Sequence, residues 1–101
     1  MTNPVFLNVV GLFAGDDQPT QPAVSEKVYF VHEPNNPYDP AAVRVDSAAR
    51  VKLGYIARTA THYIHDAVAN GLLPVGAIDS VAFGRGGKGK PKNLTIAITF
   101  E

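Results

Sequence analysis

Short β-branched and apolar segments recur along most of the chain, and some of them alternate apolar and polar positions with a period of two, which is typical of β-strands with one buried face. The clearest case is near the C-terminus, where Leu94, Ile96 and Ile98 alternate with Thr95 and Ala97. Clusters of glycine, proline, aspartate and asparagine separate the alternating or β-branched segments from one another. The segments predicted to be strands are residues 5–12, 27–32, 43–46, 51–56, 73–83 and 94–100.

One segment changes to the spacing of a helix. Within residues 59–70, apolar side chains recur every three or four positions, as in Ala60, Ile64 and Ala67, so we predict the main helix there. Asn70 followed by Gly71 is a typical helix end. A second, much shorter helical turn is predicted near residues 40–43, because an aspartate and then a proline precede it.

These elements together predict a mostly-β domain with some helix (α+β). About six strands, one main helix and a short helical turn are consistent with a small barrel. The chain has 101 residues, of which 46% are apolar, so it suits one core and not two. We therefore expect residues 1–101 to form a single domain.

Composition excludes several classes of site. The chain has no cysteine, which excludes disulfides, thiolate zinc sites and a cysteine nucleophile. No apolar run approaches the about 20 residues that cross a bilayer, and the first residues lack the pattern of a signal peptide. We expect a cytoplasmic protein that does not contact membranes.

Charge is distributed unevenly although the formal net charge is zero. Residues 1–49 carry six acids and two bases, whereas residues 50–101 carry seven bases and three acids. The basic half is compatible with a surface that binds a polyanion. The alternative is that the cations near residues 85–92 only keep a glycine-rich turn in solution.

Two motifs partly match a phosphate-binding loop and a metal site, but each lacks residues that the site requires. Residues 84–90 (GRGGKGK) match the start of a phosphate-binding loop, but Pro91 replaces the required serine or threonine and a strand-like segment follows. His62 and His65 share a helix face, which leaves a metal-dependent activity as a weak alternative, yet a metal site needs three or four ligands. No nucleophile and base stand in a recognisable pattern. We expect no enzyme activity, no metal and no cofactor.

Aromatic residues beside cations indicate another kind of function. Tyr38, Tyr55 and Phe83 fall near loops or strand ends, and Lys52 and Arg58 lie close to Tyr55 in the sequence. Such a set can stack bases and hold phosphates of a single strand. The alternative is that these rings only pack the barrel.

A longer pattern is more specific. Residues 32–45 (HEPNNPYDPAAVRV) followed by residues 53–58 (LGYIAR) resemble the HIRAN domain. The opening strand that ends at Gly11, the helix after Arg58 and a strand ending at Phe83 agree with it. The resemblance covers roughly residues 5–100, and it implies an OB-like barrel that captures the 3′-hydroxyl end of single-stranded DNA.

The resemblance also implies roles for particular residues. Tyr38 stacks on a terminal base and Asp39 accepts a hydrogen bond from the 3′-hydroxyl, while Arg58 contacts a phosphate and Phe83 supplies a second aromatic surface. Lys52, Lys88 and Lys90 are further candidates for phosphate contacts, and Tyr55 for a stacking contact. Implied partners are DNA 3′ ends and a helicase or nuclease acting in trans, in a process such as DNA repair.

The sequence departs from the family's DNA-binding pattern at three positions. Phe13 and Ala14 stand where that pattern has an arginine and a tyrosine, and Tyr55 stands where it has a histidine. The alternative function is therefore a protein-interaction domain that keeps the HIRAN fold without the DNA-end pocket.

Overall fold

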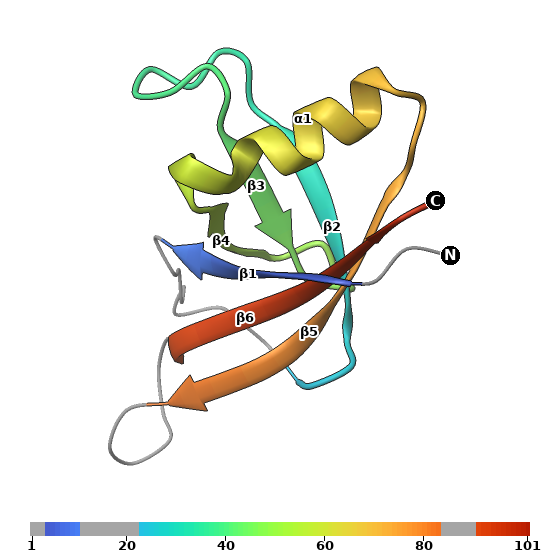
Figure 1. The fold of residues 1–101 in the computed structure, drawn as a ribbon. Coiled ribbons are helices and arrows are strands. Elements are labelled where there is room, and N and C mark those ends of the chain that lie inside the picture. Colours follow the sequence, from blue (N-terminus) through green and yellow to red (C-terminus); the bar gives the residue numbers. More distant parts are fainter. Residues whose placement is uncertain (1–3, 11–22, 84–90) are drawn as a thin grey trace.

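The computed structural model describes residues 4–10, 23–83 and 91–101 of the chain. Figure 1 shows a barrel of antiparallel strands with one helix across an end. The elements in chain order are β1 (Val5–Val10), β2 (Lys27–His32), β3 (Val43–Asp46), β4 (Lys52–Ile56), the 3-10 turn η1 (Arg58–Ala60), α1 (Thr61–Ala69), β5 (Pro74–Phe83) and β6 (Pro91–Phe100).

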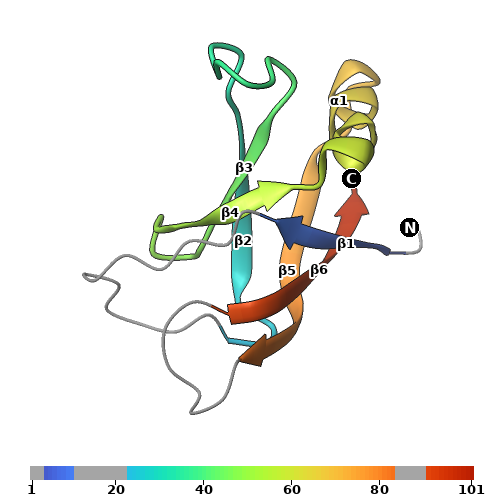
Figure 2. The same cartoon turned by 90° about the vertical axis from the view of Figure 1, so that its left-hand side faces the viewer.

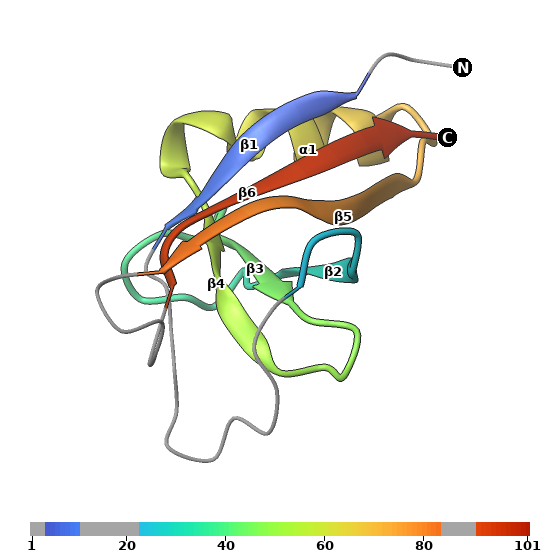
Figure 3. The same cartoon turned by 90° about the horizontal axis from the view of Figure 1, so that it is seen from below.

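The six strands close on themselves in the order β1-β4-β3-β2-β5-β6, with β6 pairing back to β1. Seen from below, β1, β6 and β5 form one side of the barrel and β2, β3 and β4 form the other (Figure 3). The long β5–β6 pair contains register shifts between Ile78 and Ser80 and between Ala82 and Phe83. Such irregularities increase the local twist and bend a sheet. The β5–β6 pair can therefore curve around the barrel.

Inward-facing residues fill the barrel. The predicted alternation of β6 is confirmed, since Leu94, Ile96 and Ile98 are at most 1% exposed. Val43 and Val45 of β3 are equally buried. Because each strand contributes every second side chain to the interior, the core is a continuous apolar cluster. Its other members are Leu7, Val9, Val28, Leu53, Ile56, Ile64 and Ile78.

The main helix is confirmed and closes one end of the barrel. Ile64 of α1 reaches the core cluster, while the opposite face of the helix is exposed. The helix ends where the sequence predicts: Gly71 has a φ of 79°, and the amide of Leu72 donates to the carbonyl of Ala67 at 2.8 Å. This is the Schellman arrangement, in which glycine takes the left-handed residue at low steric cost.

Strand limits differ slightly from the predicted ones. β1 is described as far as Val10, and the last two residues of the predicted strand, 11–12, lie outside the described residues. β6 includes Pro91, three residues before the predicted start at residue 94. A strand at that position contradicts the helix that a phosphate-binding loop requires. The predicted helical turn near residues 40–43 is a single hydrogen-bonded turn from Asp39 to Ala42, after which β3 begins at Val43. In the described part of the chain, no helix is long and apolar enough to cross a membrane.

Candidate nucleic-acid interface

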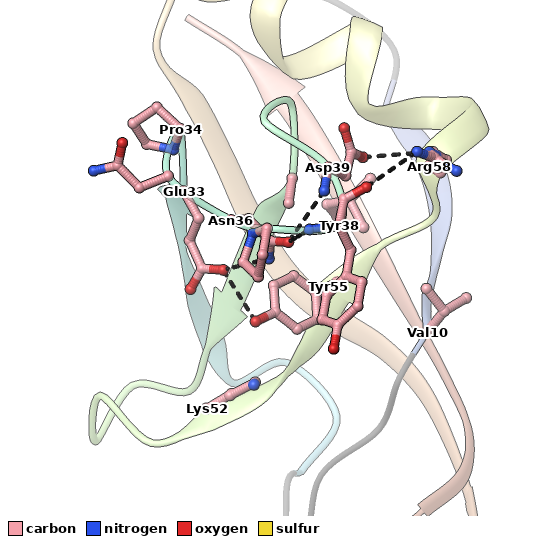
Figure 4. Close-up of a pocket in the computed structure, with 13 residues that line it drawn as sticks. Val10, Glu33, Pro34, Asn36, Tyr38, Asp39, Lys52, Tyr55 and Arg58 are labelled. Atoms are coloured by element: carbon pink, nitrogen blue, oxygen red, sulfur yellow. Dashed lines mark hydrogen bonds and ion pairs between the residues drawn. The ribbon is translucent and has the colours of Figure 1, made fainter.

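A groove of about 930 Å³ lies where the β2–β3 loop, the outer side of β4 and the turn η1 meet. Figure 2 shows that loop, residues 33–42, standing beside α1 at the same end of the barrel. Figure 4 shows the side chains that line the groove. They are Val10, Glu33, Pro34, Asn35, Asn36, Pro37, Tyr38, Asp39, Ala42, Lys52, Tyr55, Ile56 and Arg58.

Asn36 shapes the loop that carries Tyr38 and Asp39. Its side-chain oxygen accepts the backbone amide of Tyr38 at 2.9 Å and that of Asp39 at 3.1 Å. An asparagine that binds amides two and three residues ahead replaces backbone turn contacts. With its backbone held in this way, the Tyr38 side chain projects outward and is 87% exposed. An aromatic ring left so open at a groove is available to stack on a ligand.

The carboxylate of Asp39 lines the groove and has two contacts with the described residues. Its Oδ1 accepts the backbone amide of Ala41 at 2.9 Å, which is the capping role that the sequence predicts. Its Oδ2 lies 3.6 Å from Nε of Arg58, and Nη2 of Arg58 also donates to the carbonyl of Tyr38 at 3.3 Å. Each carboxylate oxygen has two lone pairs, so Asp39 keeps capacity to accept a further hydrogen bond.

Glu33 is the hub of the polar side chains under the loop. Its Oε1 accepts from Nδ2 of Asn36 at 3.1 Å and from the hydroxyl of Tyr55 at 3.0 Å. Its Oε2 accepts from Nη1 of Arg44 at 3.2 Å. The hydrogen bond from Asn36 above all, and also Tyr55 and the Arg44 charge, lower the pKa of Glu33 despite the opposing effect of burial. The charged form of Glu33 therefore joins the loop to β3 and β4.

Arg44 continues this network along β3. Its Nε and Nη2 donate to the two oxygens of Asp46 at 2.8 and 3.1 Å, so the pair is bidentate. The hydrogen bond to Asp46 is the largest cause of a raised pKa at Arg44. Arg44 also lies opposite Tyr55 in the strand register. A guanidinium held by Glu33 and Asp46 orients groups under the groove and has little capacity left for a ligand.

Two histidines, His32 of β2 and His65 of α1, hold the loop. Nε2 of His65 donates to the carbonyl of Ala41 at 2.8 Å, and Nε2 of His32 donates to the carbonyl of Pro40 at 2.9 Å. Their rings meet edge to face with centroids 4.6 Å apart. His62 lies against Tyr63 instead, so the two helix histidines do not share a site. Among the described residues, no group of three His, Asp or Glu side chains could hold a metal ion.

Five residues that the sequence predicts for the site do line one groove: Tyr38, Asp39, Lys52, Tyr55 and Arg58. The ammonium of Lys52 lies 4.6 Å from the ring centroid of Tyr55, a cation–π distance. The predicted residue Phe83 is at the end of β5, where its backbone pairs with Pro91. Lys88 and Lys90 lie outside the described residues, as do Phe13 and Ala14.

Sequence reasoning missed the supporting residues. The position of Asn36 two residues before Tyr38 is a recognisable signal for an asparagine turn. Glu33 carries no comparable signal, because its partners Arg44 and Tyr55 are brought to it by strand pairing. Val10 also joins the groove through the pairing of β1 with Tyr55 of β4.

Comparison with solved structures supports the fold. The crystal structure of the HIRAN domain of human HLTF matches with a TM-score of 0.71 and 21% sequence identity, covering 97% of this chain and 74% of that one. The crystal structure of a protein from Lactobacillus plantarum matches with a TM-score of 0.76 and 23% identity, covering 95% of this chain and 91% of that one. No curated protein sequence matches the chain.

The sequence itself matches a family. Residues 4–84, well over half of the chain, match the profile of the HIRAN domain. That range includes β1 to β5, the loop of residues 33–42 and every residue that lines the groove. The chain belongs to the HIRAN domain family.

Proposed function

We propose that this groove binds the 3′-hydroxyl end of single-stranded DNA, and that the protein is a binding module without catalytic activity. The observation that carries the proposal is that the exposed Tyr38 and the next residue in the chain, Asp39, line one groove together with the cations Lys52 and Arg58. The membership of the chain in the HIRAN family supports the same function.

Tyr38 provides the surface for a base. Its ring is 87% exposed although its backbone amide is held by Asn36, so the ring is presented with little freedom of the main chain. Bases of any sequence stack on such a ring, typically contributing about 1–3 kcal/mol each. Val10, which is 44% exposed, adds apolar surface to the same groove.

Asp39 would make the groove selective for a free 3′-hydroxyl end. A carboxylate accepts a hydrogen bond from a hydroxyl, whereas it repels a phosphate in the same place. Arg58, which lies against Asp39, is 76% exposed in its side chain and can contact the phosphate that precedes the terminal nucleotide. An internal nucleotide would bring a second phosphate towards Asp39, so the groove favours an end over a continuous strand.

Lys52 and Tyr55 form the other side of the proposed site. Lys52 lies over Tyr55 at the groove and would hold a phosphate there. Phe83 is proposed as a further contact on the strength of the family resemblance, and Lys88 and Lys90 are proposed as phosphate contacts because of their charge. The proposed partners are DNA 3′ ends, presented by a helicase or nuclease that acts on the same DNA during repair.

The test compares a short oligonucleotide that ends in a 3′-hydroxyl with the same oligonucleotide ending in a 3′-phosphate. The wild type should bind the phosphate form at least about fivefold more weakly, because a repulsion of about 1 kcal/mol has this effect on affinity. Asp39→Asn retains the side-chain oxygen that caps Ala41 and removes the charge, so it should reduce the difference. Asp79→Asn, which changes an exposed aspartate of β5, is the control and should leave the difference unchanged.

Equal binding of both forms by the wild type would contradict end recognition while leaving single-strand binding in place. Failure of the wild type to bind either form would contradict the whole proposal. That second result would favour the alternative of a protein-interaction domain.

A further inference from the structure

Besides Tyr55, a second tyrosine has cations over its ring. This residue, Tyr29, lies two strands away from the groove on the same face of the sheet. Tyr29 of β2 pairs with Asp46 of β3, and Asp46 pairs with Lys52 of β4. Directly paired residues of antiparallel strands project to the same side, so these three side chains form a row on the outer face. Lys52 lines the groove, so the row leads from the groove to Tyr29.

The guanidinium of Arg50 lies over the ring of Tyr29. Its guanidinium carbon is 3.5 Å from the centroid of the Tyr29 ring, and Nζ of Lys27 is 5.3 Å from the same centroid. Arg44 and Arg58 both have carboxylate partners. Among the described residues, the exposed Arg50 has no such partner, so the N–H groups of its guanidinium can donate to a ligand while the guanidinium lies over the ring.

The β3–β4 hairpin places Arg50 in this position. The backbone amide of Arg50 donates to the carbonyl of Ser47 at 2.9 Å, and Oγ of Ser47 accepts the amides of Ala49 and Val51 at 3.2 Å each. Arg50 itself has a φ of 65°, a left-handed conformation in which glycine meets the least steric hindrance. An arginine is held there with its side chain directed onto Tyr29.

Within residues 4–10, 23–83 and 91–101, the carboxylates near the hairpin are bound to groups other than Lys27 and Arg50. Asp46 forms a bidentate pair with Arg44. The two oxygens of Glu26 accept the backbone amides of Ala23 and Ala48. The cations of this face, Lys27 and Arg50, therefore retain attraction for an external anion.

We propose that Arg50, supported by Tyr29 and joined by Lys27, binds the phosphates of nucleotides that precede the 3′ end. This inference rests on the proposed function, because it extends the path of the same strand from the groove past Lys52. Two strand spacings, about 10 Å, separate Lys52 from Tyr29, which is about three steps of a stacked strand at ~3.4 Å per nucleotide. A trinucleotide therefore stays in the groove, and a decanucleotide reaches Arg50.

The experiment measures binding of a trinucleotide and a decanucleotide, both ending in a 3′-hydroxyl, by isothermal titration calorimetry at several salt concentrations. Arg50→Gly suits the left-handed backbone and removes the guanidinium. It should weaken the decanucleotide severalfold and reduce the slope of log affinity against log salt by about 0.7, the value for one lost phosphate contact. Binding of the trinucleotide should not change.

Matched variants separate the guanidinium from the backbone. Ser25, with a φ of 74°, is the other described non-glycine residue in the left-handed region, so Ser25→Gly relieves the same strain without changing charge and should bind both oligonucleotides normally. Lys27→Ala should repeat the length-dependent loss. Tyr38→Ala should weaken both lengths.

Three results would overturn the inference, and they are distinguishable. If Arg50→Gly and Lys27→Ala bind the decanucleotide with wild-type affinity and salt slope, the path past Tyr29 is wrong while the groove stands. If they weaken both lengths equally, these cations do not act on the preceding nucleotides. If the wild type binds neither oligonucleotide, the proposed function fails and this inference fails with it.

Discussion

At the scale of single residues, one asparagine and one glutamate determine how the site is presented. Asn36 holds the backbone amides of Tyr38 and Asp39, and Glu33 holds Asn36. These hydrogen bonds fix the main chain at Tyr38, so its position does not depend on packing of the ring into the core. The ring stays exposed at the groove. The positions of Tyr38 and Asp39, the proposed DNA contacts, thus depend on Asn36 and Glu33, for which no DNA contact is proposed.

Tyr38→Ala should weaken binding of every oligonucleotide by about 1–3 kcal/mol, because stacking does not depend on the end group. Its side chain is 87% exposed, so the free energy of unfolding should change little. Tyr63→Ala removes a half-exposed tyrosine of α1 and serves as the control for both measurements. An affinity for oligonucleotides that survives Tyr38→Ala unchanged would exclude this ring from the site.

Glu33→Gln should make the stability of the protein less dependent on pH. The pKa of Glu33 in the folded state lies below the ordinary value of 4.5. Folding therefore favours the charged form of Glu33, and the charged carboxylate stabilises the folded state. The stabilisation is complete above about pH 4.5 and is lost as the pH falls through the folded pKa. Urea unfolding from pH 7 to pH 3 should show wild type and variant converging in acid. A constant difference across that range would contradict a charged Glu33 as the hub.

At the scale of elements, the helix and the loop support each other. α1 closes the end of the barrel with Ile64 and holds the loop through His65, whose ring donates to Ala41. His32, at the end of β2, donates a hydrogen bond to the carbonyl of Pro40. The loop of residues 33–42 is therefore attached at several places to regular structure, which reduces the entropy that a ligand must overcome to order it.

Gly71→Ala should lower the free energy of unfolding by about 1–2 kcal/mol, because a β-carbon is disfavoured at a φ of 79°. No atom lies within 4 Å of the added carbon, so the effect is conformational and not a clash. Gly71→Asn should cost less, since asparagine tolerates this region better. Equal stability of Gly71→Ala and wild type in thermal unfolding would show that the helix end is not constrained as described.

At the scale of the whole molecule, the formal net charge of zero prevents strong attraction of DNA to every face. Binding by local cations such as Arg58, Lys52 and Arg50 should nevertheless depend on salt. Three or four phosphate contacts correspond to a slope of log affinity against log salt of about −2 to −3 for a single strand. Fluorescence titration of one oligonucleotide from low to high salt measures this slope. Measurable affinity without salt dependence would indicate that the ligand is held by uncharged contacts.

Local sequence determined the elements and part of the site. β-branched, apolar segments between turn-forming residues, some of them alternating, located the six strands to within a few residues. Asn70-Gly71 marked the end of the helix, because this signal depends on backbone geometry within a few residues. Asp39 as a cap was also readable, since its partner Ala41 is two residues away. The candidate contacts Tyr38 and Arg58 came from a family pattern in the sequence.

Tertiary structure decided which distant residues meet. Glu33 joins Arg44 and Tyr55 only because β3 pairs with both β2 and β4, and Arg50 reaches Tyr29 only through the hairpin that follows β3. The sequence placed the polar groups of residues 33–40 in a turn and could not show their partners. Contacts between strands depend on register and barrel closure, which are set by the burial of the whole core and not by the residues that make the contact.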